Sequence, residues 1–203
     1  MMIIRRFKFF CQYDTRIFLQ SCRDFIKGRV LDLGCGRAKY RELILASANE
    51  YVGADKYSKS EDIVKCDADR TPFPDESFDT VVCTQVIEHV LEPSDVIREI
   101  NRVLKKQGFF ILVTPWLHPY HGEPEDYYRF SKDALLYLLK KNGFKAIKIS
   151  TSGGRWRVIE TFSRRWLPNF LYIMLFPFFI IFDYLFGKSG DDTPSHLVIA
   201  SKV

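Results

Sequence analysis

The sequence is poor in the residues that build disulfide frameworks and metal clusters. It has five cysteines, an odd number, at positions 11, 22, 35, 66 and 83, and no two of them are spaced as Cys-x-x-Cys. That spacing is typical of zinc and redox pairs, and an even set is expected in small secreted domains that are stapled by disulfides. We therefore expect reduced thiols, a cytosolic protein, and neither a structural zinc site nor a disulfide framework.

The chain also lacks an internal repeat, a low-complexity tract and a secretory leader. Its first residues, MMIIRRFKFFC, contain no long apolar run followed by small residues, so we expect no cleaved signal. The formal net charge is only +5, and it lies within the first 30 residues, where seven basic side chains meet two acidic ones. This excess is too mild to indicate a nucleic-acid partner by itself.

The chain does have enough apolar residues for a sizeable core. Of its 203 residues, 47% are hydrophobic and 27% are charged, which is typical of a globular protein. The length suits one domain with room for an insertion. We therefore expect residues 1–203 to form a single domain.

Strand-like runs alternate with helical segments along most of the chain. Strands are predicted at residues 29–34, 50–55, 62–67, 78–85, 109–115, 144–150 and 196–203. Helices are predicted from an Asp14 cap to about Lys27, around residues 40–45, from Pro93 to a stop at Gly108, and from a Ser131 cap to Asn142-Gly143. The alternation predicts an α/β fold with a parallel sheet and helices on both faces. In such folds ligands bind beyond the carboxyl ends of the strands.

The loop after the first predicted strand, VLDLGCGRAKY, has small residues where a strand should meet a helix. Gly34 and Gly36 allow the backbone to approach a ligand, and a helix that starts there would offer unpaired N–H groups. A pyrophosphate-binding Gly-x-Gly-x-x-Gly pattern would need glycine where Lys39 stands, and Asp32 suits a cationic group better than a phosphate. Asp55, at the end of the second strand, can accept both hydroxyls of a ribose. The pattern indicates an adenosine with a positively charged tail.

Three segments in order, VLDLGCG, YVGAD and CDADRTPFPDESFDTVVCTQVIEHV, resemble the S-adenosylmethionine-dependent methyltransferases of Rossmann-like fold, and among them the type 11 group. The resemblance covers about residues 29–115. It implies a seven-stranded sheet with six parallel strands, a last antiparallel strand and helices on both faces. The apolar and basic segment 152–194 would then be an insertion before the last strand.

The resemblance also implies a set of residues that bind S-adenosylmethionine. Asp32 would face the ammonium group, Asp55 the ribose hydroxyls, and Asp67 the adenine amino group. Asp32 and Asp67 could instead cap turns, and Cys35 could be only a small apolar residue. The family's third glycine is Ala38 here, which still permits close packing. The implied cofactor-binding residues are Asp32, Gly34, Cys35, Gly36, Asp55, Lys56, Asp67, Ala68, Thr84 and Gln85.

The loop after the fifth predicted strand, WLHPYHGEPEDYYRF, is dense in groups that can bind a substrate or move a proton. We predict His121 as the general base, with His118 as the second choice. A loop that is merely stabilised by an Asp126–Arg129 pair is the alternative, and His89 could serve packing or capping. Similar loops occur, by resemblance, in methyltransferases of cell-surface polysaccharide and lipid biosynthesis. The residues expected to contact the acceptor are His89, Trp116, Tyr127, Tyr128 and Arg129.

Metal binding by this loop is not expected. Its two histidines are three residues apart and lie beside carboxylates, but Pro119 and Pro124 prevent a helical face of ligands. The sequence analysis therefore assigns no metal site.

A long apolar run precedes the last predicted strand. Residues 166–186 carry one charge, Asp183, and residues 170–182 carry none. About 20 apolar residues can span a hydrocarbon core of about 30 Å, but one crossing would separate the last strand from its sheet. Pro168 and Pro177 also interrupt a straight helix. We expect a segment in the membrane interface, a shallow hairpin, or a lid or dimer interface. Basic and aromatic neighbours favour an anionic surface: Arg155, Trp156, Arg157, Arg164, Arg165 and Trp166.

The sequence thus predicts an enzyme that transfers a methyl group from S-adenosylmethionine to an oxygen, less readily a nitrogen, of a small or lipid-linked acceptor. We expect it to be peripheral on the cytoplasmic face of the membrane. One alternative is a soluble small-molecule methyltransferase whose apolar segment is a lid. Another is a membrane-recruited binding module of the same fold without catalysis. A nucleic-acid substrate is disfavoured because CTQVIEH lacks the [DNS]PP[YFW] motif of amino-methylating enzymes.

Overall fold

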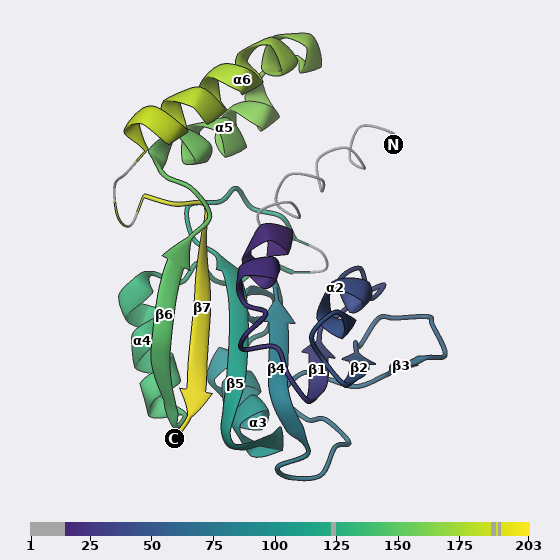
Figure 1. Ribbon diagram of the computed structural model, residues 1–203. Coiled ribbons are helices and arrows are strands. Elements are labelled where there is room, and N and C mark those ends of the chain that lie inside the picture. Colours follow the sequence, from purple (N-terminus) through teal and green to yellow (C-terminus); the bar gives the residue numbers. More distant parts are fainter. Residues whose placement is uncertain (1–14, 123–124, 188–189, 191) are drawn as a thin grey trace.

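The computed structural model describes residues 15–122, 125–187, 190 and 192–203. Its centre is a seven-stranded sheet with the order β3-β2-β1-β4-β5-β7-β6 (Figure 1). β7 runs antiparallel to its neighbours β5 and β6, whereas the strands from β3 to β5 pair in parallel. This confirms the predicted α/β sheet with one antiparallel strand. The strands are β1 (Arg29–Leu33), β2 (Glu50–Ala54), β3 (Ile63–Val64), β4 (Phe78–Thr84), β5 (Leu104–Pro115), β6 (Phe144–Thr151) and β7 (Ser195–Lys202).

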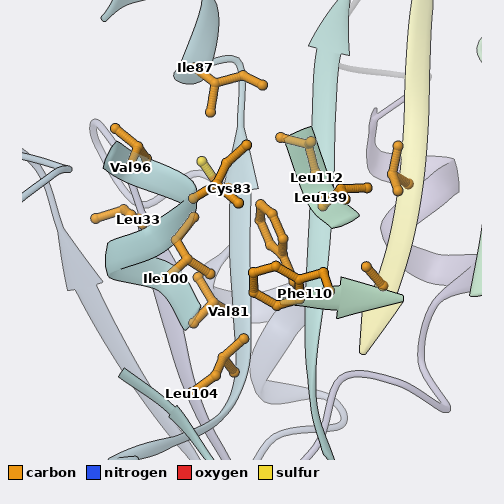
Figure 2. Close-up of a cluster of buried hydrophobic side chains, with 14 of the residues drawn as sticks. Leu33, Val81, Cys83, Ile87, Val96, Ile100, Leu104, Phe110, Leu112 and Leu139 are labelled. Atoms are coloured by element: carbon orange, nitrogen blue, oxygen red, sulfur yellow. The ribbon is translucent and has the colours of Figure 1, made fainter. Parts of the chain in front are cut away.

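Helices cover both faces of the sheet, as predicted. α3 (Pro93–Val103) and α4 (Lys132–Lys141) pack on one face, while α2 (Arg41–Leu45) and the helical residues 15–21 pack on the other. Successive strand residues point to opposite faces, so each strand supplies both layers of the core. In β5, for example, Phe110 joins the α3 and α4 side, where Figure 2 shows it among aliphatic side chains.

The predicted helix caps agree in part with the structure. Ser131 caps α4, since its Oγ accepts a hydrogen bond from Ala134 N at 3.2 Å. The predicted Asp14 cap lies outside the described residues. α3 ends at Val103 rather than at Gly108, because Leu104 already pairs with Phe78 in the sheet.

The loop after β1 also differs from its expected form. No helix starts at the glycines, and α2 begins only at Arg41. Gly34, Gly36 and Ala38 all have a positive φ, which keeps this stretch out of the right-handed helical region. The helix N-terminus expected beside the glycines is therefore absent from this described loop.

The apolar insertion forms a helical hairpin between β6 and β7. Its helices are α5 (Arg155–Trp166) and α6 (Asn169–Phe186), and they stand beyond the carboxyl end of β6 (Figure 1). A Cβ on Gly154 would lie 1.8 Å from the carbonyl oxygen of Gly187, so the hairpin begins and ends at one point. Pro168 separates the helices, but Pro177 lies inside α6 without ending it, contrary to the prediction. Contacts to α5 on both sides of Pro177 hold the two halves of α6 in line: Tyr172 with Glu160, and Phe182 with Trp156.

Phe110 is fully buried in the core, so truncating it should lower the stability of the fold strongly. We expect Phe110→Ala to lower the free energy of unfolding by about 3–5 kcal/mol, because it removes contacts and leaves a cavity. The exposed Tyr137 of α4 provides the control, since Tyr137→Ala should change stability by less than about 0.5 kcal/mol. Urea unfolding followed by circular dichroism measures both. Equal effects of the two substitutions would contradict this account of the core.

Candidate active site

Two carboxylates lie near the carboxyl ends of β1 and β2. Asp32, in β1, is 1% exposed, and its Oδ2 accepts a hydrogen bond from the Tyr51 hydroxyl at 2.8 Å. Asp55 follows β2, and its oxygens accept from the backbone N–H groups of Gly36 at 2.9 Å and Tyr57 at 2.8 Å. Each carboxylate oxygen can accept more than one hydrogen bond, so Asp55 retains capacity for ligand hydroxyls.

The electrostatics of Asp32 favour a cationic ligand. Burial raises the pKa of Asp32 to about 6, and the Tyr51 hydrogen bond opposes that rise only in part, while nearby Asp55 adds to it. A nearby cation would favour the charged carboxylate. The ammonium group of S-adenosylmethionine, which the sequence resemblance implies, supplies such a cation. Asp32 therefore fits the predicted role.

The glycine loop leaves room beside these acids. Gly34 and Gly36 have φ values of +73° and +58°, a region that glycine adopts without steric cost. A Cβ on Gly34 would lie 2.2 Å from Cγ2 of Val86, so glycine is needed where the loop packs on the segment after β4. A Cβ on Gly36 would meet open space among the described residues. A ligand can therefore approach the backbone at Gly36, beside Asp55.

The residues that the resemblance implies for binding the adenine also lie close together. Lys56 Nζ lies 2.5 Å from Asp67 Oδ1, in an ion pair whose two side chains are each more than half exposed. One oxygen of Asp67 is thus engaged, but an exposed pair of this kind is weak and can rearrange for a ligand. Ala68 packs against the core. Cys35 is buried, which raises the pKa of its thiol to about 12, so the thiol is neutral near pH 7.

Thr84 and Gln85, which the resemblance implies for cofactor binding, lie at and directly after the end of β4. Gln85 has a φ of +57°, and its backbone N–H donates to Val113 O at 2.8 Å. Its side-chain Nε2 is buried and has no hydrogen-bond partner among the described residues. The backbone turns sharply here and leads into a short 3-10 helix, Ile87–His89.

A cluster of histidines and carboxylates lies directly after this turn. Glu88 is fully buried, and burial raises its pKa to about 8. Its Oε1 has no hydrogen-bond partner among the described residues. The Nε2 atoms of His89 and His121 are the ring nitrogens that face it, at 3.7 and 3.8 Å. Thr114 donates to the other oxygen, Oε2, over a long 3.5 Å.

A buried ion pair holds the loop that carries His121. Arg129 Nη2 donates to Asp126 Oδ2 at 2.6 Å, and Nη1 contacts Oδ1. Burial alone would raise the pKa of Asp126, but hydrogen bonds from Arg129 and the His121 N–H lower it to about 2. The pair expected for a stabilised loop therefore exists. It also positions His121, whose backbone N–H donates to Asp126 Oδ2 at 2.8 Å.

His118 lies beside His121 with its rings edge to face. Its Nδ1 donates to the carbonyl of Pro119 at 2.9 Å. Burial lowers the pKa of His118 to about 4, and the charges of His121, Arg129 and Arg164 add to this shift. Burial also lowers the pKa of His121. Both imidazoles are thus neutral near pH 7.

The acceptor residues predicted from the sequence are brought together only in part. A pocket of about 280 Å³ is lined by His118, Tyr120, Asp126, Tyr127, Tyr128 and Arg129. His89 joins Glu88 instead, and its Nδ1 hydrogen-bonds the carbonyl of Glu125. Trp116 lies apart from this pocket, with its ring stacked on His196 of β7.

Two functional candidates were missed by sequence reasoning. Glu88 was passed over within CTQVIEHV, although a lone acid directly after a buried strand is a usable signal. Tyr51 was treated only as a strand residue, and nothing in the sequence shows that it would bond Asp32. The two halves of the site are neighbours, since Gly34 packs on Val86, two residues before Glu88.

Comparisons with known proteins agree with this geometry. Residues 31–112 match a family model described as a methyltransferase domain. The chain is 27% identical over 128 residues to an uncharacterized methyltransferase, YcgJ, of Bacillus subtilis, which covers 56% of this chain and 48% of that protein. It is 32% identical over 101 residues to phosphatidylethanolamine N-methyltransferase of Cereibacter sphaeroides, covering 42% of this chain and 50% of that protein. The matches thus span about half the length of these curated relatives.

The fold has a solved counterpart over nearly its whole length. A SAM-dependent methyltransferase from Archaeoglobus fulgidus superposes with a TM-score of 0.61 at 19% identity, covering 92% of this chain and 94% of that one. At this identity the likeness concerns the fold alone. It confirms the predicted seven-stranded methyltransferase sheet.

The buried Asp32 predicts a pH-dependent affinity for S-adenosylmethionine. Its carboxyl is neutral below about pH 6, so affinity should fall toward the limit of about tenfold per pH unit as the pH decreases further. Above that pH the charged form is already present and affinity should level off. Titration calorimetry from about pH 5 to about pH 8 measures this dependence. Asp32→Asn should bind weakly at every pH, and an unchanged pH slope in that variant would exclude Asp32 as its source.

Proposed function

We propose that this chain is an S-adenosylmethionine-dependent methyltransferase, because its residues 31–112 match a family model described as a methyltransferase domain. We propose that it transfers the methyl group of S-adenosylmethionine to an oxygen of a small or lipid-linked acceptor at a membrane surface. A nitrogen acceptor is the second choice. The observation that carries the proposal is the open glycine loop with Asp32 and Asp55, which packs on Val86 just before the cluster of Glu88, His89 and His121.

Each part of the bound cofactor has a residue to hold it. Asp32 would pair with the ammonium group, Asp55 would accept the ribose hydroxyls, and Asp67 with the backbone of Ala68 would meet the adenine. Gly34 and Gly36 leave the backbone accessible, and Thr84 and Gln85 border the methionyl end. S-adenosylmethionine supplies an electrophilic methyl group on a sulfonium, so the protein has to position the acceptor, exclude water and receive a proton.

His121 is the better placed of the two predicted bases. Its ring faces the buried Glu88 and is fixed by Asp126 and Arg129, whereas His118 directs its Nδ1–H at its own neighbour's carbonyl. A hydroxyl acceptor needs a group that takes its proton, and His121 is the residue we propose for that task. Tyr127 and Tyr128, both partly exposed, would shape the acceptor pocket.

The α5–α6 hairpin supports a location at the membrane surface. α6 is the one described helix long and apolar enough to cross a membrane by length and composition, with a mean hydropathy of 1.8 and none of its window buried. An exposed apolar surface of this size calls for a partner. We take that partner to be lipid, because charged Arg165 and aromatic Trp166 lie exposed at the tip where the helices join. The exposed apolar residues from the tip along α6 are Trp166, Phe170, Ile173, Met174, Phe178, Ile180, Ile181, Phe182, Tyr184, Leu185 and Phe186.

Two of the four arginines that the sequence analysis assigned to headgroups have another task. Arg157 and Arg164 pair with the buried Glu160 at 3.2 and 2.9 Å, inside the hairpin. Arg165 lies exposed next to Trp166 and supplies a basic charge for an anionic surface. The hairpin thus offers fewer basic side chains to an anionic surface than the composition of the segment suggested.

The lid interpretation is less well supported. α6 packs on α5 and has no buried residue, whereas a lid that covers substrate would bury one face. We therefore regard residues 152–194 as an interfacial appendage of a single methyltransferase unit, peripheral on the cytoplasmic face. The printed name of the Cereibacter relative, a phosphatidylethanolamine N-methyltransferase, is compatible with an acceptor that resides in a membrane.

Calorimetry with S-adenosylmethionine tests the enzymatic proposal directly. We expect one binding site per chain, and Asp55→Ala should weaken it by at least about tenfold, because a charged hydrogen-bond acceptor contributes about 1.5–3 kcal/mol. Asp69→Ala, which removes an exposed acid from the same edge of the sheet, is the control and should bind normally. A well-folded wild-type chain that does not bind would leave a non-catalytic module as the better account.

Vesicle flotation tests the membrane proposal. Wild-type protein should float with vesicles of phosphatidylglycerol and phosphatidylcholine, because the exposed face of α6 enters the interface. The triple variant Met174→Glu, Phe178→Glu, Ile181→Glu should stay at the bottom, since these side chains are exposed and lie on one face of α6.

A matched control carries the same charge change elsewhere. Ile17→Glu, Tyr137→Glu and Ile147→Glu replace exposed apolar residues away from the hairpin and should leave flotation intact. Equal loss in both triple variants would show a general charge effect. A wild-type chain that ignores vesicles but forms a dimer, which the α6 variant abolishes, would assign this face to a second copy instead.

A further inference from the structure

We propose that Glu88, His89 and His121 bind one divalent transition-metal cation, with Zn²⁺ and Mn²⁺ as the chemical type. The site's catalytic role, though not its existence, rests on the proposed methyl transfer. The ligand atoms of the three residues all lie within 4.8 Å of one another. They come from two separate segments, the short 3-10 helix after β4 and the loop after β5. Sequence spacing within one loop could not reveal this set.

The carboxylate at the centre of the set lacks the partner that its burial demands. Glu88 has no exposed surface, and its Oε1 accepts no hydrogen bond among the described residues. Unpaired buried carboxylates are costly, and a metal ion is one of the few ways to compensate them. The Nε2 atoms of His89 and His121 face this same oxygen at 3.7 and 3.8 Å. Two ligands on one tetrahedral ion lie closer than this, at about 3.3 Å, so the three side chains, whose ligand atoms lie within 4.8 Å of one another, would draw together around the ion.

In metal-binding histidines, the ring nitrogen that does not bind the ion usually donates to a carbonyl or a carboxylate, and the Nδ1 atoms of His89 and His121 each have such a group nearby. His89 donates its Nδ1–H to the carbonyl of Glu125, which leaves the Nε2 lone pair toward Glu88. His121 Nδ1 lies 3.3 Å from Asp126 Oδ2 and 3.3 Å from Arg129 Nη2. Because a guanidinium can only donate, His121 Nδ1 accepts from Arg129 in the metal-free chain and Nε2 carries the ring proton. A cation bound at Nε2 would displace that proton, and the ring would then carry its proton on Nδ1, facing the Asp126 carboxylate. A carboxylate or carbonyl behind each imidazole is the usual support of a histidine–metal bond.

The donor set decides the kind of ion. Two imidazoles and one carboxylate suit Zn²⁺ or Mn²⁺ better than Ca²⁺, which prefers oxygen ligands alone. Three protein ligands leave at least one position open, as in catalytic sites. An acceptor hydroxyl bound there would lose its proton more readily, and that proton would pass to solvent as the oxygen takes the methyl group.

His121 cannot be a metal ligand and the general base at the same time. With an ion bound, Nε2 of His121 is a ligand and cannot also receive the acceptor's proton. His121 then contributes by holding the cation, and the acceptor's oxygen is activated by the metal. Measuring metal binding separates the two roles without any assay of activity.

The test measures binding of Co²⁺, whose visible absorption reports its ligands, and of Zn²⁺ by mass spectrometry after dialysis. The full chain, first stripped with a chelator, should bind one equivalent of either ion. Glu88→Gln and His121→Ala should each weaken binding by at least about 100-fold, because loss of a ligand exceeds the 10–100-fold effect typical of outer partners. Circular dichroism confirms that each variant is folded.

Two matched variants serve as controls. Glu92→Gln changes an exposed acid four residues after Glu88, and His118→Asn changes the neighbouring histidine that is outside the set. Both should bind the ion like wild type. A folded wild-type chain that takes up neither ion overturns the proposal, as does binding that persists in both Glu88→Gln and His121→Ala.

Calorimetry on the metal-free chain separates this proposal from the proposed function. If S-adenosylmethionine binds and the cations do not, the metal site alone fails and His121 stands as the base. If the cations bind through Glu88 and His121 but S-adenosylmethionine does not, the methyltransferase proposal fails and the metal site stands.

Discussion

Buried negative charge is the constraint on which the loops and appendages of this protein depend. A carboxylate removed from water needs a cation or several hydrogen bonds. Asp126 is satisfied by Arg129, and that pair shapes the loop after β5. Glu160 is satisfied by two arginines of α5, and the hydroxyl of Tyr172 in α6 also donates to it, which joins α6 to α5. Glu88 has no such partner among the described residues, and burial raises its pKa to about 8, so its carboxyl keeps its proton near pH 7 instead of carrying a charge.

The mostly apolar hairpin also contains a carboxylate, Asp183, whose charge is compensated by hydrogen bonds. Asp183 is the only charge between residues 166 and 186, and its carboxylate accepts hydrogen bonds from the N–H groups of Gly154 and Arg157. These groups lie at the N-terminus of α5, where N–H groups have no partner within the helix. One acid of α6 thus caps α5 and closes the base of the hairpin. The exposed side chains of α6 are mainly apolar.

Much of the fold followed from the sequence because strands and glycine turns are local patterns. The strands that line the core, the Ser131 cap and the acids Asp32 and Asp55 all depend on spacing along the chain. The parts that could not be predicted depend on distant partners. Arg157 was assigned to headgroups because the sequence does not show that Glu160, three residues along α5, would be buried there with Tyr172 of α6. Likewise, the role that we propose for Glu88 depends on His121, which the loop after β5 places beside it.

The positions of hairpin and site bear on how an acceptor would arrive. The α5–α6 hairpin stands beyond the carboxyl end of β6, at the edge of the sheet where the loops of the site also lie (Figure 1). Arg164 of α5 is near enough to His118 to influence its pKa. A hairpin held in the membrane interface would therefore bring the acceptor pocket close to the lipid surface. A lipid-linked acceptor could then reach His121 by moving along that surface, without leaving the membrane for bulk water.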